Sequence, residues 1–329
     1  MSTTALGRVP FIPEETLRAH NVFEFGDDRF RAAARARQAL LREAKGWPMG
    51  IWAKDSERSR PREMGSYLAE DHNGANFITS EIAALARRVV AWREDDALIE
   101  TDRLYRNMLS SMPACMNLTG PLALDPRLAT AVLRKLAPDF VHKVDATLFE
   151  TSPGRRHAAY TMCRSAFDVL FKVTTTDGEH GFISCELKYT ESCFEQPARL
   201  RPRWDELSRL STLFVDPDHP QLRAAPLQQM WRQHLSFSML NAGLYSAGRY
   251  ILIAPTLNRA VQEAVALYRS HLLPGGIVPF EFISFEQFIE AIRRSGAKDI
   301  AALLHERYVD FTPVDALITG QQKHDQPRI

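Results

Sequence analysis

Residues 167–189 read FDVLFKVTTTDGEHGFISCELKY, and this stretch decides the fold. Two runs rich in β-branched and aromatic residues, 167–175 and 182–189, flank the turn signal Asp177-Gly178. Such a pattern predicts an antiparallel β-hairpin. Opposed residues in this hairpin should have numbers that sum to about 354–356, so Asp168 is expected to lie opposite Glu186 or its neighbour.

The two faces of this hairpin differ in chemistry, because side chains alternate between faces along a strand. Asp168, Glu186 and Lys188 share one face. The other face is apolar and should be the core: Val169, Phe171, Val173, Ile183, Cys185, Leu187 and Tyr189. Two opposed carboxylates repel each other unless a proton or a cation lies between them, and hard oxygen ligands suit Mg²⁺ or Mn²⁺. The alternative is an exposed hairpin face with a cross-strand ion pair.

Helices and further strands surround the hairpin. Helical periodicity or helix-boundary signals predict helices at 29–45, 76–112, 125–136, 203–213, 227–245 and 258–272, and closing helices to 308. Strand signals mark 144–150, 250–254 and 280–284, whereas 50–74 is polar and predicts a linker or exposed loop. This order predicts an α/β fold with a mixed β-sheet core flanked by helices, preceded by an N-terminal, mainly helical extension.

The overall composition is that of an ordinary globular protein, with 329 residues, 45% hydrophobic, 25% charged and a net charge of +1. No apolar run reaches the length of a membrane span, so we expect a cytoplasmic protein with no membrane partner. The four cysteines form no CxxC pair, which predicts buried thiols rather than a zinc site. The sequence contains no GxxxxGK[ST], GxGxxG, GxSxG or HExxH motif, which argues against P-loop ATPases, simple dinucleotide-dependent enzymes, esterases and zincins.

The positive charge is concentrated in one segment. Residues 29–62 hold ten basic and three acidic residues. A local basic field of this kind favours a polyanionic partner such as nucleic acid. The expected phosphate contacts are Arg29, Arg31, Arg35, Arg37, Arg42 and Lys45. The alternative is a helix whose arginines simply face water.

Asp168, followed after the hairpin by Glu186-Leu187-Lys188, resembles the active-site signature of the PD-(D/E)XK nuclease superfamily, which has the restriction-endonuclease-like fold. The resemblance implies that Asp168 and Glu186 bind the metal ion and that Lys188 serves the nucleophilic water. The superfamily's order of helix, three strands, helix and strand matches 125–254, although Phe167 stands where the name-giving pattern has proline. Further stretches resemble one branch of that superfamily, and together the resemblance covers 61–310: GSYL at 65–68, NF at 76–77, NLTGPL at 117–122, FE at 149–150 and QMWRQHL at 229–235.

Three further residues are candidates for the same site. Glu150 ends a predicted strand and is a candidate third oxygen ligand for the metal, the alternative being a surface carboxylate. In the helix predicted at 227–245, the apolar residues Leu227, Met230, Trp231 and Leu235 define a buried side and leave Gln229, Arg232 and Gln233 on a neighbouring polar stripe. We expect Gln229 and Arg232 to face the site, with Arg232 on a phosphate group; its alternative is a structural ion pair. Glu191 is expected to face solvent, and His234 to be a core histidine.

The sequence therefore predicts a basic extension at 1–60, a nuclease-like α/β domain at 61–318 and a disordered tail at 319–329. The expected activity is hydrolysis of phosphodiester bonds with Mg²⁺ or Mn²⁺, in DNA as the expected substrate, with endo- and exonuclease both open. Alanine at Asp168, Glu186 or Lys188 should abolish cleavage and leave the fold intact. The alternative is a catalytically silent nucleic-acid-binding or protein-interaction module. A homodimer is suggested by analogy with restriction enzymes alone.

Overall fold

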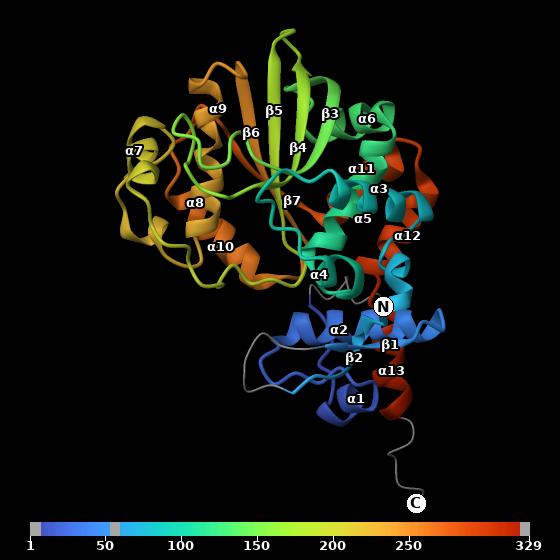
Figure 1. Cartoon of the computed structure of the whole chain (residues 1–329). Coiled ribbons are helices and arrows are strands. Elements are labelled where there is room, and N and C mark those ends of the chain that lie inside the picture. Colours follow the sequence, from blue (N-terminus) through green and yellow to red (C-terminus); the bar gives the residue numbers. More distant parts are fainter. Residues whose placement is uncertain (1–7, 53–59, 323–329) are drawn as a thin grey trace, which may run out of the picture.

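A five-stranded mixed sheet forms the centre of the protein in a computed structural model that describes residues 8–52 and 60–322 (Figure 1). Its strands follow the chain order: β3 (Val141–Thr151), β4 (Phe167–Thr175), β5 (His180–Leu187), β6 (Ala247–Ala254) and β7 (Phe280–Ser284). The first three strands pair antiparallel, whereas β5, β6 and β7 run parallel. The predicted mixed α/β sheet is thereby confirmed.

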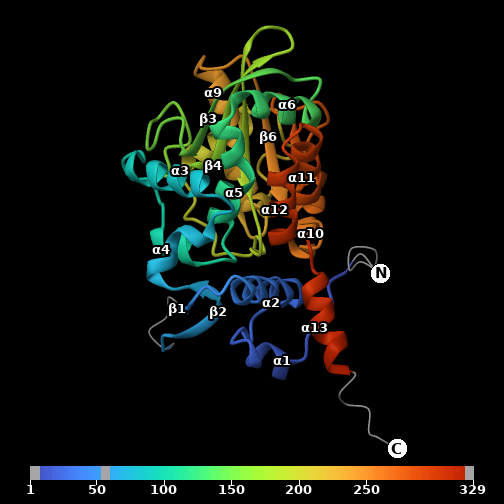
Figure 2. The ribbon, with the colours of Figure 1, turned by 90° about the vertical axis from the view of Figure 1, so that its right-hand side faces the viewer.

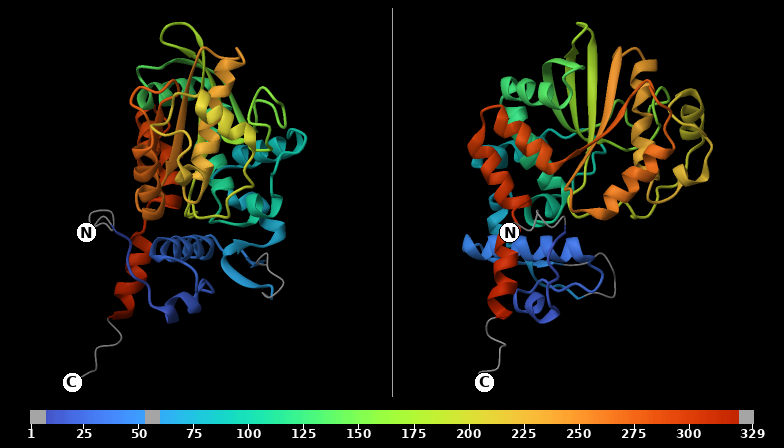
Figure 3. Two further views of the ribbon diagram at one scale, coloured as in Figure 1. Left: turned by 90° about the vertical axis from the view of Figure 1, so that its left-hand side faces the viewer. Right: turned by 180° about the vertical axis from the view of Figure 1, so that it is seen from behind.

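Helices cover both faces of this sheet (Figures 1 and 3). One face is covered by α5 (Ser111–Leu124), α6 (Pro126–Leu136), α11 (Phe285–Arg294) and α12 (Lys298–Tyr308). The other is covered by α7 (Pro202–Leu210), α8 (Gln228–His234) and α10 (Arg259–Ser270). Shorter elements join these: α3 (Ser80–Ala91), α4 (Thr101–Arg106), α9 (Ser238–Asn241) and the 3-10 helices η2 (Glu70–Asn76), η3 (Pro220–Arg223) and η4 (Leu235–Phe237).

A smaller layer lies against one end of this body (Figures 1 and 2). It contains α1 (Glu14–Ala19), α2 (Arg29–Ala44), the two-stranded sheet of β1 (Met49–Trp52) and β2 (Arg62–Leu68), and α13 (Thr312–Gln322). The expectation of a linker or exposed loop at 50–74 is wrong for the described part of that segment, because β1 and β2 pair antiparallel and residues 64–68 of β2 are buried; residues 53–59 lie outside the described ranges. The expected boundary near residue 60 therefore falls between two paired strands.

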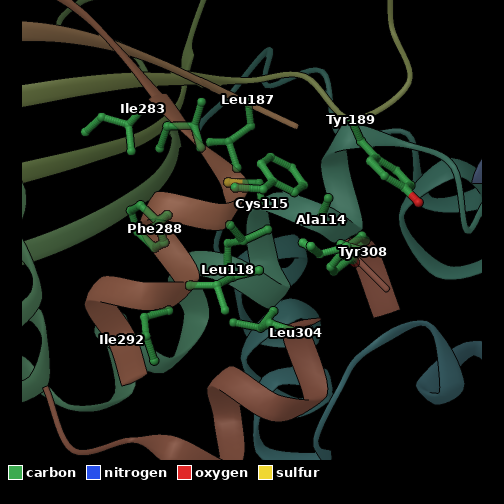
Figure 4. Close-up of a cluster of buried hydrophobic side chains, with 14 of the residues drawn as sticks. Ala114, Cys115, Leu118, Leu187, Tyr189, Ile283, Phe288, Ile292, Leu304 and Tyr308 are labelled. Atoms are coloured by element: carbon green, nitrogen blue, oxygen red, sulfur yellow. The ribbon is translucent and has the colours of Figure 1, made fainter. Parts of the chain in front are cut away.

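The register of the hairpin agrees with the sequence. Val169 pairs with Cys185 and Phe171 with Ile183, and continuing this register by one residue places Asp168 opposite Glu186. The apolar face lies in the core between the sheet and α5, α11 and α12, where Leu187 packs near Cys115 and Leu118 (Figure 4). The opposite face is covered as well, by a second core that includes Leu170 and Phe182. The hairpin face that bears Asp168 and Glu186 is therefore not a free surface.

Several helices depart from the prediction. The helix predicted at 76–112 is divided into α3, α4 and the start of α5. The last of these continues through Gly120 and Pro121 to Leu124, although an internal proline costs about 3 kcal/mol. Residues 113–122 are all buried, so packing outweighs that cost, and Gly120 lets Ile82 approach to within 3.3 Å of where a Cβ would stand. The helix predicted at 227–245 is divided into α8, η4 and α9 and ends at Asn241, two residues before Gly243, which has a φ of 71°. Residues 319–322 of the predicted tail belong to α13, and 323–329 lie outside the described residues.

Three arginines of α2 are buried and do not add positive charge to the surface. Arg35, Arg37 and Arg42 are only 4%, 3% and 8% exposed. Arg35 holds Asp27 through two hydrogen bonds of 2.6 and 3.0 Å, Arg37 donates to the carbonyls of Glu306 and Asp310, and Arg42 donates to those of Gly65 and Trp47. The prediction that these three contact phosphate is wrong. Their guanidinium groups are buried in hydrogen bonds that hold α2 to neighbouring segments.

The other cations of this set do not form a cluster. Arg29 and Lys45 are exposed but stand at opposite ends of α2. Arg31 forms an ion pair with Asp27 at 3.1 Å and donates to the Thr190 carbonyl. In the described ranges, no helix is long and apolar enough to cross a membrane.

The Arg35–Asp27 pair gives a first testable expectation. Because both side chains are about 5% exposed, Arg35→Met should lower the free energy of unfolding by about 3 kcal/mol, as loss of one partner of a buried ion pair does. Arg29→Met on the same helix is the matched control and should change it by less than about 0.5 kcal/mol. Urea unfolding measures both, and equal effects would mean that the pair is not structural.

Candidate active site

Asp168 lies on β4 and points to the face covered by α8. Its Oδ2 accepts a hydrogen bond from the Leu187 backbone N–H at 2.7 Å. This contact follows from the hairpin register, which brings the start of β4 beside the end of β5. Burial, followed by repulsion from Glu186 and Glu150, raises the pKa of Asp168 well above its ordinary value. Asp168 therefore stands in a site that disfavours its negative charge.

Glu186 is surrounded by hydrogen-bond donors. Its carboxylate accepts from Gln229 Nε2 at 2.6 Å and from Gln233 Nε2, and the Lys188 Nζ lies 3.0 Å from Oε1. Only 4% of the residue is exposed. Three donors therefore converge on the two oxygens of this buried carboxylate and fix its orientation.

Lys188 completes this cluster as an ammonium donor. Besides Glu186 it binds the Gln229 Oε1 at 2.7 Å, which confirms that Gln229 faces Asp168 and Glu186 as predicted. Burial acts to lower the pKa of Lys188, but attraction to Glu186, Glu195 and Glu191 outweighs it, so the pKa stands above its ordinary value. The lysine is therefore suited to orient a water or stabilise negative charge rather than to accept a proton.

Glu150 lies on the other side of Asp168. Phe149 pairs with Val169 and Thr151 with Phe167, so Glu150 occupies the position opposite Asp168 on β3. Its φ of 46° is rare for a residue with a side chain and interrupts the regular alternation of the strand. Burial, followed by repulsion from Glu186, raises the pKa of Glu150 to about 7. The three carboxylates thus come from three adjacent strands.

Gln233 is the residue of this cluster that sequence reasoning did not select as a site residue. It was placed on the polar stripe, and its spacing of four from Gln229 is the signal that puts both amides on one side of α8. The Tyr250 hydroxyl donates to Gln233 Oε1 at 2.9 Å, which fixes the amide so that its NH₂ group faces Glu186. Lys188 fixes the Gln229 amide in the same way.

These groups line an open pocket of about 370 Å³. Glu150, Asp168, Glu186, Gln229 and Gln233 lie on its wall, together with Leu98, Trp204 and the arginines Arg155, Arg164, Arg199, Arg201 and Arg232. Arg232 stacks over Trp204 at 5.5 Å, and its buried Nε has no hydrogen-bond partner within the described residues. The structure therefore places Arg232 at the site and shows no ion pair for it in the described part of the chain.

The chemistry of the donor set fits a divalent cation in one respect and not in another. Burial, followed by repulsion among the carboxylates, raises the pKa values of Asp168 and Glu150, and a bound cation would relieve that repulsion. Yet no group of three or more His, Cys, Asp or Glu side chains among residues 8–52 and 60–322 already surrounds a common point. The side chains thus suit an ion held by one or two carboxylates and water, as Mg²⁺ commonly is.

Two neighbouring residues were also predicted. The expectation that Glu191 faces solvent is wrong: it accepts hydrogen bonds from the backbone N–H groups of Ser111, Tyr189 and Thr190, and so ties the end of β5 to the start of α5. His234 is confirmed as a core histidine. It bonds the Tyr268 hydroxyl and the Val278 carbonyl, and burial lowers its pKa to about 4.

Comparison with known proteins assigns the chain to a family but not to a characterised relative. No curated protein and no solved structure matches the chain. A family model described as the PD-(D/E)XK nuclease superfamily matches residues 26–310, which includes every residue of the cluster around Asp168 and Glu186. Because this match spans most of the sequence, the chain belongs to the PD-(D/E)XK nuclease superfamily.

Proposed function

We propose that this protein is a nuclease that uses a divalent metal ion to hydrolyse phosphodiester bonds, with DNA as the substrate. The observation that carries the proposal is that Asp168 and Glu186 lie opposite each other on adjacent strands at an open pocket. The ammonium of Lys188 forms an ion pair with Glu186 there. Membership of the superfamily supports it. Mg²⁺ or Mn²⁺ would be held by Asp168 and Glu186, and by Glu150 directly or through water. When bound, such an ion supplies Lewis-acid stabilisation of the charge that develops on the phosphate.

The side chains around the carboxylates have separate tasks in this proposal. Lys188 donates hydrogen bonds from a fixed ammonium and holds the attacking water in place. Gln229 and Gln233 fix the orientation of Glu186. Arg232 presents a planar guanidinium to the pocket and binds a phosphate of the substrate through two parallel hydrogen bonds, a contact that lysine does not reproduce.

The second candidate is a catalytically silent module that binds nucleic acid or protein. Two observations favour the enzyme. Asp168, Glu186 and Lys188 are all present and in contact range. In addition, burial and repulsion raise the pKa of Asp168, and acids with such perturbed pKa values cluster at functional sites. The test is a cleavage assay on end-labelled DNA and RNA with Mg²⁺, with Mn²⁺ and with chelator. Metal-dependent products from DNA support the enzyme, whereas no product from any polymer supports the silent module.

Gln233 provides a prediction about metal binding. Gln233→Leu removes one donor that orients Glu186, so the affinity for Mn²⁺ should fall by about 10–100-fold, as for other outer partners of metal ligands. Tyr250→Phe leaves the amide in place but unfixed and should have a smaller effect. Calorimetric titration of the metal without nucleic acid measures both. Undiminished affinity in Gln233→Leu would show that this amide does not position Glu186.

A further inference from the structure

We propose that the rim of the pocket is a binding surface for an unpaired strand of nucleic acid. The rim consists here of three arginines, Arg164, Arg199 and Arg201, and three apolar residues, Leu98, Phe194 and Leu200. This inference rests on the proposed function and names the class of substrate that enters the same site.

The rim arginines are exposed at the mouth of the pocket. Arg164 lies on the loop between β3 and β4, and Arg199 and Arg201 lie on the loop between β5 and α7. Across residues 8–52 and 60–322, none of their side chains forms an ion pair or donates a hydrogen bond. Most other arginines near the site have partners: Arg155 holds Glu94, and Arg203 holds Glu206. Unpaired guanidinium groups above a phosphodiester site are suited to bind backbone phosphates.

Both loops are fixed by side-chain hydrogen bonds from α7 and α8. The Trp204 Nε1 donates to the Thr161 carbonyl at 2.7 Å, which fixes the loop that carries Arg164. The Gln228 side chain exchanges two hydrogen bonds of 2.7 Å with the backbone of Ala198, next to Arg199. Each loop also buries a cysteine, Cys163 or Cys193, in the core beneath it. The arginines therefore stand on a preorganised surface, which lowers the entropic cost of binding.

Large apolar side chains are exposed on the pocket wall and on the loop that carries Arg199 and Arg201. Leu98 on the pocket wall is 65% exposed, and Leu200, between the two rim arginines, is 46% exposed. Phe194, on the same loop, is 62% exposed. A duplex turns its phosphates outward and hides its bases, so it would leave these side chains uncovered. The bases of an unpaired strand are free to pack on them while its phosphates meet the arginines.

The depth of the site favours the same substrate. Glu186 and Lys188 are 4% and 6% exposed, so the reacting phosphate has to enter the pocket between the two loops. A duplex is stiff over about 50 nm and bends at an energetic cost. An unpaired strand changes direction at each nucleotide and brings a phosphate down to the carboxylates without breaking base pairs.

The test measures binding separately from cleavage. Wild-type protein in chelator is titrated into a labelled DNA oligonucleotide, either alone or annealed to its complement, and fluorescence anisotropy is recorded at several salt concentrations. The unpaired strand should bind at least about tenfold more tightly. The triple variant Arg164→Ala, Arg199→Ala, Arg201→Ala should lower the slope of log affinity against log salt by up to about two units, since each phosphate contact on a single strand contributes about 0.7.

The apolar residues and a matched control complete the design. Leu98→Ala with Phe194→Ala should weaken binding of the unpaired strand by about tenfold and leave the salt slope unchanged. The control triple, Arg127→Ala, Lys135→Ala, Arg294→Ala, removes three exposed cations that do not line the pocket and should change neither quantity.

Three outcomes overturn the proposal: equal or tighter binding of the duplex, an unchanged slope in the rim triple, or an equal change in the control triple. Cleavage is assayed in parallel with Mg²⁺, which keeps the two proposals apart. Binding that depends on the rim but without any cleavage refutes the nuclease and leaves the binding surface standing. Cleavage of a duplex that binds as tightly as the single strand supports the nuclease and refutes the binding surface for an unpaired strand.

Discussion

Lys188→Met should destabilise the protein by about 3–5 kcal/mol, which is the largest effect on stability expected for a single side chain of the site. The Lys188 and Glu186 side chains are 8% and 6% exposed and 3.0 Å apart. Removing the ammonium leaves a buried carboxylate whose remaining donors are the two glutamine amides. Urea unfolding without metal measures the effect. The sequence alone suggested that alanine here would leave the fold intact, and the burial of the pair changes that expectation.

A double-mutant cycle isolates the pair. Adding Glu186→Gln to Lys188→Met removes the uncompensated charge, so the double variant should recover at least about half of the lost stability. Lys143→Met is the surface control, because Lys143 is 64% exposed beside Asp145 and should matter by less than about 1 kcal/mol. Additive losses in the cycle would show that Lys188 and Glu186 are not coupled.

Asp168→Asn should move activity and stability in opposite directions. Asparagine keeps an oxygen for the Leu187 N–H and offers an amide to the neighbouring carboxylates, but it is a poor metal ligand. Cleavage should fall by at least about 10³-fold, since a metal ion supplies several kcal/mol of charge stabilisation. Stability should rise, because asparagine has no charged form and so avoids the cost that burial and the neighbouring carboxylates impose on ionisation of Asp168.

The pH dependence of that gain follows from the raised pKa of Asp168. A carboxyl group whose pKa is higher in the folded state binds its proton more tightly there than in the unfolded chain. The unfolded chain loses this proton first, at the ordinary carboxyl pKa of about 4, so the stability of wild type falls as the pH rises above that value. The variant and wild type should be equally stable in acid and diverge towards neutral pH. Mn²⁺ at 100 times its dissociation constant should stabilise wild type by about 2.7 kcal/mol and the variant much less. A variant no more stable than wild type at neutral pH would contradict the burial of this charge.

The central hairpin was predictable from the sequence because local rules decide it. Alternation between faces and the Asp177-Gly178 turn determine which residues face the core and which residues meet across the strands. Gly178, with a φ of 81°, adopts the backbone conformation that such a turn requires. Asp168, Glu186 and Lys188 could be grouped on one face for this reason.

Contacts between distant segments were not predictable in the same way. A run of arginines on a helix looks the same whether its charges face water or are buried. Arg35 is buried against the nearby Asp27, whereas Arg37 is buried against the carbonyls of Glu306 and Asp310, far along the chain. The loops that border the pocket carry no periodic pattern, and positive φ angles at Met162 and Cys193 shape them instead. The cationic surface at the site therefore came from Arg164, Arg199 and Arg201, which no motif marks.

Metal-dependent cleavage by wild-type protein, beside the Asp168→Asn variant purified in the same way, tests the central claim most directly. The variant serves as the control for contaminating nucleases, since it should fold and behave identically during purification. The account predicts that wild type cleaves DNA with Mg²⁺ or Mn²⁺ and stops in chelator, while the variant preparation is inactive under every condition. Equal cleavage by both preparations, or none by wild type with either metal, would contradict it.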